Sequence, residues 1–153
     1  MGTPDFGPPS RAIIVGFAAG AISALTFHAF AWWVFYQIGQ QALAPWPMRP
    51  NGFGVPLMIS LAFWAGLWGV VLALVAPRLA GRRPFWQLGL ALSVAATLVQ
   101  LFVVPMLRGA PVAAGWNAMA IIRAFIINGT WGIGVAVLAT NFANFARRRS
   151  SAA

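Results

Sequence analysis

Four long apolar runs divide the chain and determine how many helices to expect. They cover about residues 11–38, 55–76, 86–107 and 116–146. Each run reaches the roughly 20 residues that an α-helix needs to cross the hydrocarbon core of a bilayer. The pattern therefore predicts an all-α fold in which residues 11–146 form an integral membrane four-helix bundle. The first run is too long for a signal-peptide core and has no clear small-residue cleavage site, so we expect it to be retained as a helix.

Segments rich in glycine, proline or arginine separate and flank these runs. Residues 1–10 contain three prolines and two glycines, which predict an irregular tail. Residues 40–54 contain three prolines around Trp46, which predict a rigid loop with an interfacial tryptophan. Residues 147–153 begin with three arginines and predict a short basic tail.

The second and fourth runs contain two stretches, 63–76 and 126–139, that align without a gap. Five small or aromatic positions coincide: Gly66, Trp68, Gly69, Ala73 and Ala76 align with Gly129, Trp131, Gly132, Ala136 and Ala139. This coincidence favours an internal repeat over chance similarity between two apolar helices, although the first and third runs match poorly. A repeat would give two helical hairpins related by an axis along the membrane normal, as in parallel transporter repeats.

Small residues at helical spacing predict where the helices pack, because they let two backbones approach closely. The expected packing residues are Gly16, Gly20, Gly66, Gly69, Gly129, Gly132, Trp68 and Trp131. Trp64 and the two tryptophans of this set lie away from the ends of their runs, so we expect them to pack against small residues. Five other tryptophans suit the aromatic belts at the membrane interfaces: Trp32, Trp33, Trp46, Trp86 and Trp116.

Composition and charge agree with a membrane location. Hydrophobic residues make up 61% of the 153 residues and charged residues 7%, far outside the range of soluble domains. The net charge of +9 comes from ten arginines against one acid, Asp5. Because the arginines flank the apolar runs, they predict contact with anionic lipid headgroups and not with nucleic acid. Cysteine is absent, which excludes disulfides, thiolate catalysis and cysteine-ligated metals.

The distribution of arginines predicts the orientation of the chain. One side of the membrane would hold Arg11, Arg78, Arg82, Arg83, Arg147, Arg148 and Arg149, and the other side Arg49 and Arg108, with Arg123 just inside the fourth run. The positive-inside rule then places both termini in the cytoplasm and the 40–54 loop in the periplasm. Arginine without lysine, together with abundant alanine, indicates a bacterium. We expect a multi-pass inner-membrane protein in contact with lipid; whether it joins a homo-oligomer or a larger membrane complex stays open.

Polar side chains inside the membrane are costly and are therefore the first candidates for a site. Six of them fall in the periplasmic half of their helices or near the middle of the membrane: His28, Ser60, Gln100, Arg123, Asn128 and Thr130. They come from all four runs, which predicts a shared polar pocket. The other half holds Ser23, Ser93, Thr97, Thr140, Asn141 and Asn144. We expect its serines and threonines to bond to their own helix backbone.

The histidine and the arginine of this set each have a structural alternative. His28 could titrate, donate to a substrate or ligate haem, but a neutral ring hydrogen-bonded to another helix is the favoured interpretation. Arg123 could bind an anion beside Asn128, snorkel to the interface or hydrogen-bond within the bundle. Since no second histidine, no cysteine and no carboxylate occurs in any run, we expect no metal and no cofactor.

The residues that are missing also narrow the function. Proton-coupled transport and intramembrane hydrolysis usually need a carboxylate or a nucleophile–base pair within the membrane, and neither a Walker loop nor a G-x-G-x-x-G motif occurs. We therefore expect a non-catalytic structural or accessory component. The alternatives are a small oligomeric channel or facilitator for a neutral or anionic solute and, more distantly, a lipid-modifying enzyme built on His28.

Five segments resemble those of a known group of proteins. They are Leu25-Thr26-Phe27-His28, Pro45-Trp46-Pro47-Met48, Gly54-Val55-Pro56 and the stretches 63–69 and 127–132. Together they look like segments of small uncharacterised four-helix inner-membrane proteins of proteobacteria, and they extend over most of the chain. The resemblance implies a bacterial inner-membrane location and implies nothing about an activity.

Overall fold

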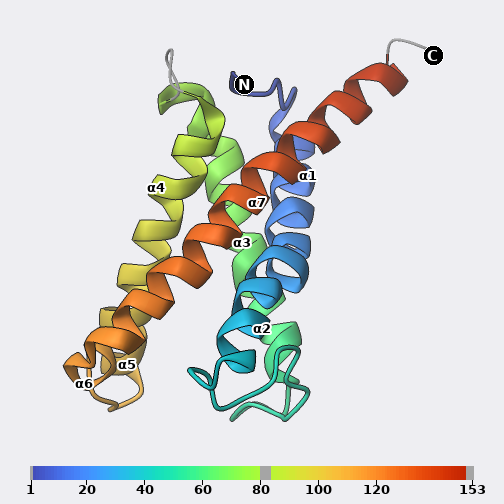
Figure 1. Ribbon diagram of the computed structural model, residues 1–153. Helices are drawn as coiled ribbons and strands as arrows, with labels where there is room; N and C mark the ends of the chain where they lie inside the picture. The colour runs from blue at the N-terminus through green and yellow to red at the C-terminus, as the bar shows by residue number, and fades with distance from the viewer. Residues whose placement is uncertain (1, 80–83, 151–153) are drawn as a thin grey trace.

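Helices dominate the fold, and four helical spans are long and apolar enough to cross a membrane (Figure 1). The computed structural model describes residues 2–79 and 84–150. The spans are Pro9–Gln37, Leu57–Leu79, Phe85–Leu107 and Ala118–Arg149. They confirm the predicted all-α class and the four apolar membrane segments, so the chain is a multi-pass membrane protein.

A π-helical turn interrupts the first and the third span. The first span consists of α1 (Pro9–Ser23), the π-helical turn η1 (Ala24–His28) and α2 (Ala29–Gln37). The third consists of α4 (Phe85–Leu98), the π-helical turn η2 (Val99–Val103) and α5 (Val104–Leu107). The second span is α3 (Leu57–Leu79), and the fourth is α7 (Ala118–Ser150), which follows the short α6 (Ala113–Trp116). π-helical turns are frequent at functional sites, and each of these two contains one of the predicted pocket residues, His28 in η1 and Gln100 in η2.

The helix ends differ from the expected ones in two places. α3 continues through Pro77 to Leu79, whereas the second apolar run was expected to end at about residue 76, directly before the proline. α7 continues through Arg147, Arg148 and Arg149, so the expected basic tail begins inside a helix. Arginine is a good helix former, and positive charge at a helix C-terminus is favourable to the helix dipole. Between the second and third runs, the sequence Gly81-Arg82-Arg83-Pro84 predicts a tight basic turn; it lies outside the described residues except for Pro84.

The helices pair as two hairpins, α1 with α3 and α4 with α7, and α7 also crosses α1 (Figure 1). Glycines allow the close approach within each hairpin. A Cβ added to Gly16 would lie 2.6 Å from the carbonyl oxygen of Gly69, and one added to Gly69 would clash with the carbonyl oxygen of Gly16. Gly89 and Gly132 oppose each other in the same reciprocal way in the second hairpin. Any side chain at these positions would separate the two backbones.

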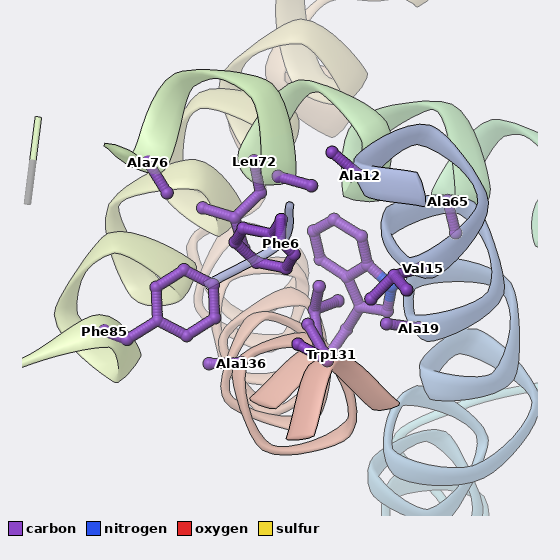
Figure 2. Packing of buried hydrophobic residues seen from close by; sticks show 14 of the residues in the cluster. Phe6, Ala12, Val15, Ala19, Ala65, Leu72, Ala76, Phe85, Trp131 and Ala136 are labelled. Carbon is purple, nitrogen blue, oxygen red and sulfur yellow. The ribbon is translucent and has the colours of Figure 1, made fainter. Parts of the chain in front are cut away.

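The core includes a residue of the N-terminal tail, Phe6, which is only 3% exposed. Its ring packs edge-on against Phe85, with the centroids 5.8 Å apart, and Figure 2 shows it between Phe85, Leu72 and Trp131. The Nε of Arg11 donates to the carbonyl oxygen of Phe6 at 2.8 Å and holds the tail in place. The tail therefore closes one end of the bundle, where both hairpins meet.

Candidate functional site

Two of the six polar residues predicted to form a pocket contact each other directly. The Nδ2 of Asn128 on α7 donates to the Oε1 of Gln100 at 2.7 Å. Gln100 belongs to the π-helical turn η2, and Asn128 is buried. The bond thus joins the two helices of the second hairpin. It gives each side-chain amide a partner that the hydrocarbon core cannot supply.

His28 lies at the end of the other π-helical turn, η1, and is 8% exposed. Its ring packs edge-on against Trp32, with the centroids 5.8 Å apart. Its Nδ1 is buried and has no hydrogen-bond partner in the described part of the chain. The expected bond from a neutral ring to another helix is therefore not found at this nitrogen. A buried polar atom of this kind is uncommon and calls for an explanation.

The other three predicted pocket residues have separate surroundings. A guanidinium nitrogen of Arg123, Nη1, donates to the carbonyl oxygen of Gln40, just beyond the end of α2. The bond is exposed and joins α7 to the loop after the first span; it does not join two helices of the bundle. The hydroxyl of Thr130 donates to Ile126 of its own helix at 2.9 Å, and Ser60 lies half-buried on α3.

A pair of buried hydrogen bonds joins the two hairpins. The hydroxyl of Ser23 on α1 donates to the carbonyl oxygen of Trp131 on α7 at 2.7 Å, and the indole Nε1 of Trp131 donates to the carbonyl oxygen of Gly20 at 3.0 Å. The expectation that Ser23 bonds to its own helix was wrong, because Gly134 brings α7 against Ser23 and places an acceptor within reach. The hydroxyls of Thr97 and Thr140 do bond to their own helices.

The loop after the first span folds back onto it through two indole groups. The Nε1 of Trp46 donates to the carbonyl oxygen of Leu25 at 3.0 Å, and that of Trp32 donates to Leu43 at 2.8 Å. In η1 the N–H of Ala29 bonds to Ala24 instead of Leu25, which leaves the Leu25 carbonyl accessible to a side chain. Sequence reasoning placed Trp46 at the interface but missed this bond, since nothing in the pattern marked the π-helical turn.

The expected packing residues differ in how closely they meet a neighbour. Trp131 is 3% exposed, whereas Trp68 is half-buried and Trp64 is 60% exposed. The expectation that Trp64 packs against small residues was therefore wrong; its ring lies edge-on to Phe63 on the outer surface of α3. Gly129 has room for a side chain, because an added Cβ would meet only Leu90, at 3.6 Å. Gly66 faces the ring of Phe17.

Apolar grooves lie between pairs of helices in the described part of the chain, among them one between α1 and α7 and one between α3 and α4. The larger, of about 280 Å³, is lined by Ile14, Val15, Ala18, Ile22, Phe142 and Phe145 between α1 and α7. The smaller, of about 210 Å³, lies between α3 and α4 and is lined by Val71, Leu72, Val75, Ala76, Leu79, Leu88, Ala91 and Leu92. None of the six predicted pocket residues lines either groove. Nor do three His, Cys, Asp or Glu side chains cluster anywhere in residues 2–79 and 84–150.

Comparison with known proteins adds no family to this geometry. The chain matches no known family, no curated protein and no solved structure. The resemblance to proteobacterial inner-membrane proteins therefore stays a prediction. What the helices establish is a small membrane protein with four spans.

Proposed function

We propose that the chain is a non-catalytic structural or accessory component of a bacterial inner membrane. The proposal rests on how the buried polar side chains are used: the bonds of Ser23 and Asn128 and the indole of Trp131 join one helix to another. Ligand sites usually keep a few polar groups directed into a cavity. Here the grooves have apolar walls, and the polar groups stabilise helix contacts.

An internal repeat of two parallel hairpins is part of this proposal. The aligned residues Gly69 and Gly132 each oppose a glycine of the preceding span. Each also faces the next small residue of that span: an added Cβ would lie 3.0 Å from the Cα of Gly20 in one hairpin and 2.8 Å from the Cβ of Ser93 in the other. A π-helical turn follows the contact in both hairpins. These shared contacts support a common origin for the two hairpins more strongly than the sequence alignment of 63–76 with 126–139 does by itself.

The proposed orientation places both termini in the cytoplasm. Four spans return the chain to the side on which it began, and Figure 1 draws the N-terminal tail and the end of α7 at the same end of the bundle. Because the chain has no cysteine, single cysteines report the topology directly. We expect G52C to react with a membrane-impermeant maleimide in intact spheroplasts and S10C to react only after permeabilisation. The opposite pattern would invert the orientation.

Reconstitution in liposomes tests the proposed lack of transport. Purified protein should pass small neutral solutes and anions at the rate of protein-free liposomes. Alanine at Asn128 or Arg123 should lower the stability or the abundance of the protein in cells, because these side chains join structural elements. A solute flux above background that N128A abolishes would contradict the structural proposal.

A channel or facilitator is the second candidate function, and the unpaired Nδ1 of His28 is the observation that favours it. The nitrogen belongs to the last residue of a π-helical turn, a feature that is frequent at functional sites. For this function an oligomer would have to supply the path, and H28A would change a measurable solute flux. If the wild-type protein shows no flux, this candidate is removed and the histidine is structural.

A further inference from the structure

The larger apolar groove lies on the surface that faces lipid. Its wall residues Ile14 and Phe145 are 69% and 58% exposed, and they come from α1 and α7 respectively. All six lining residues are apolar, so the groove offers no partner to water or to a polar ligand. In a membrane, a hydrocarbon chain is the occupant that such walls favour, because it gains dispersion contacts on both sides.

Two arginines, one from each helix, lie at the end of this groove nearest the chain termini. The guanidinium carbon of Arg149 lies 4.7 Å from the ring centroid of Phe145, which itself lines the groove. Arg11 lies one helical turn before Ile14 and Val15, and its bond to the carbonyl oxygen of Phe6 restricts its position. Positive charge is thus held at the mouth of the groove by an aromatic contact on one helix and a hydrogen bond on the other.

The chain carries far fewer negative than positive side chains. Asp5 is the one acidic residue in the sequence, against ten arginines. Most of the counter-charge for the arginines must therefore come from outside the chain. Guanidinium groups bind phosphate oxygens with bidentate geometry, and anionic lipid headgroups attract arginines near the membrane surface.

We infer that the α1–α7 groove binds an anionic glycerophospholipid, with one acyl chain between the two helices and the headgroup phosphate at Arg149 and Arg11. The groove between α3 and α4 is less suited, because among the described residues an arginine comes from one of its two helices: Arg78 lies at the end of α3, whereas α4 contains none. The site does not depend on the orientation of the protein. Only the identity of the leaflet, the cytoplasmic one, rests on the proposed topology.

The headgroup part of the site is tested by lipid titration and native mass spectrometry of the delipidated protein. Dioleoyl phosphatidylglycerol should bind at least fivefold more tightly than dioleoyl phosphatidylcholine, which has the same acyl chains. R149Q should lower the ratio of the two affinities about fivefold, which is the factor expected for one arginine near the membrane surface. R108Q, which removes an exposed arginine of the expected periplasmic side, should leave the preference unchanged. Equal losses in R149Q and R108Q would indicate nonspecific attraction and overturn the site.

The acyl-chain part is tested by filling each groove in turn. A18F places a ring in the α1–α7 groove and should abolish tight phosphatidylglycerol binding, whereas A91F fills the α3–α4 groove and should not. If A18F does not fold, the smaller A18L replaces it. Phosphatidylglycerol binding that survives A18F or A18L, or that inorganic phosphate displaces completely, would show that no acyl chain occupies the groove. Neither result would bear on the solute-flux test of the proposed function.

Discussion

The indole Nε1 of Trp131 lies 3.0 Å from the carbonyl oxygen of Gly20, and this bond connects the two hairpins at the centre of the bundle. The same carbonyl accepts the N–H of Ala24, so it already has a partner within its own helix. The hydroxyl of Ser23 completes the connection by donating to the Trp131 carbonyl at 2.7 Å. Gly20 and Ser23, which lie one helical turn apart on α1, thus both bond to Trp131 of α7. Lipid offers no competing donor or acceptor there.

Replacing Trp131 with phenylalanine should weaken the contact between the hairpins. W131F removes the indole donor and leaves a small void, so we expect the free energy of unfolding in detergent to fall by about 1–3 kcal/mol. Its matched control is W68F at the aligned position of α3, where the side chain is half-buried. We expect W68F to cost less than about 1 kcal/mol. Equal losses in the two variants would show that the bond to Gly20 contributes nothing measurable.

Alanine at two neighbouring glycines of α7 should have opposite effects. In G132A the new Cβ would clash with the carbonyl oxygen of Gly89, which forces α4 and α7 apart and costs about 1–3 kcal/mol. In G129A it would meet only Leu90, at 3.6 Å, and alanine favours a helix over glycine by about 1 kcal/mol. Thermal unfolding should therefore show a lower midpoint for G132A and an unchanged or higher one for G129A. The reverse order would contradict the close approach of the two backbones.

The bond between Asn128 and Gln100 can be measured by a double-mutant cycle. N128A, Q100A and the double variant should give a coupling energy of about 0.6 kcal/mol and at most about 1.7 kcal/mol, the mean and the maximum found for hydrogen bonds between membrane helices. Unfolding of all four proteins in the same detergent supplies the values. A coupling energy of zero would mean that both amides find equivalent partners elsewhere.

Phe6 should contribute to stability although it lies in an irregular tail. F6A removes a nearly fully buried ring from the contact with Phe85, and we expect a loss of about 3 kcal/mol in the free energy of unfolding. The tail of this variant should also become more susceptible to limited proteolysis. F53A is the control, because Phe53 in the loop after the first span is 91% exposed. Similar stability in the two variants would contradict the insertion of Phe6.

The spans could be predicted from hydropathy because a membrane helix must keep about 20 residues apolar, whatever its neighbours are. The residue types near the C-terminal ends of the helices were less informative about where each helix stops. Pro77 did not end α3, which continues for two more residues to Leu79. The arginines extended α7, because arginine is a good helix former and positive charge is favourable at a helix C-terminus. Phe6 could not be placed, although one signal was present: it is a large apolar residue in a tail of glycine and proline.

The candidate site was harder to predict than the spans. Depth in the membrane grouped His28 with Gln100, Arg123 and Asn128, but depth does not determine which helix faces a side chain meets. Only the Gln100–Asn128 contact is direct. The bond from Ser23 to Trp131 depends on the crossing of α1 and α7, and that from Trp46 to Leu25 depends on a π-helical turn. Neither feature has a signature in a single sequence.

α7 contains 33 residues and is therefore about 50 Å long, against a hydrocarbon core of about 30 Å. It lies obliquely in Figure 1, and a helix of this length must tilt or extend beyond the lipid. In a thinner bilayer, more of its arginine-bearing end emerges into water; in a thicker one, that end is drawn toward the phosphate layer. Bilayer thickness therefore changes the depth at which the arginine-bearing end of α7 lies, and membranes of different composition would hold that end at different heights.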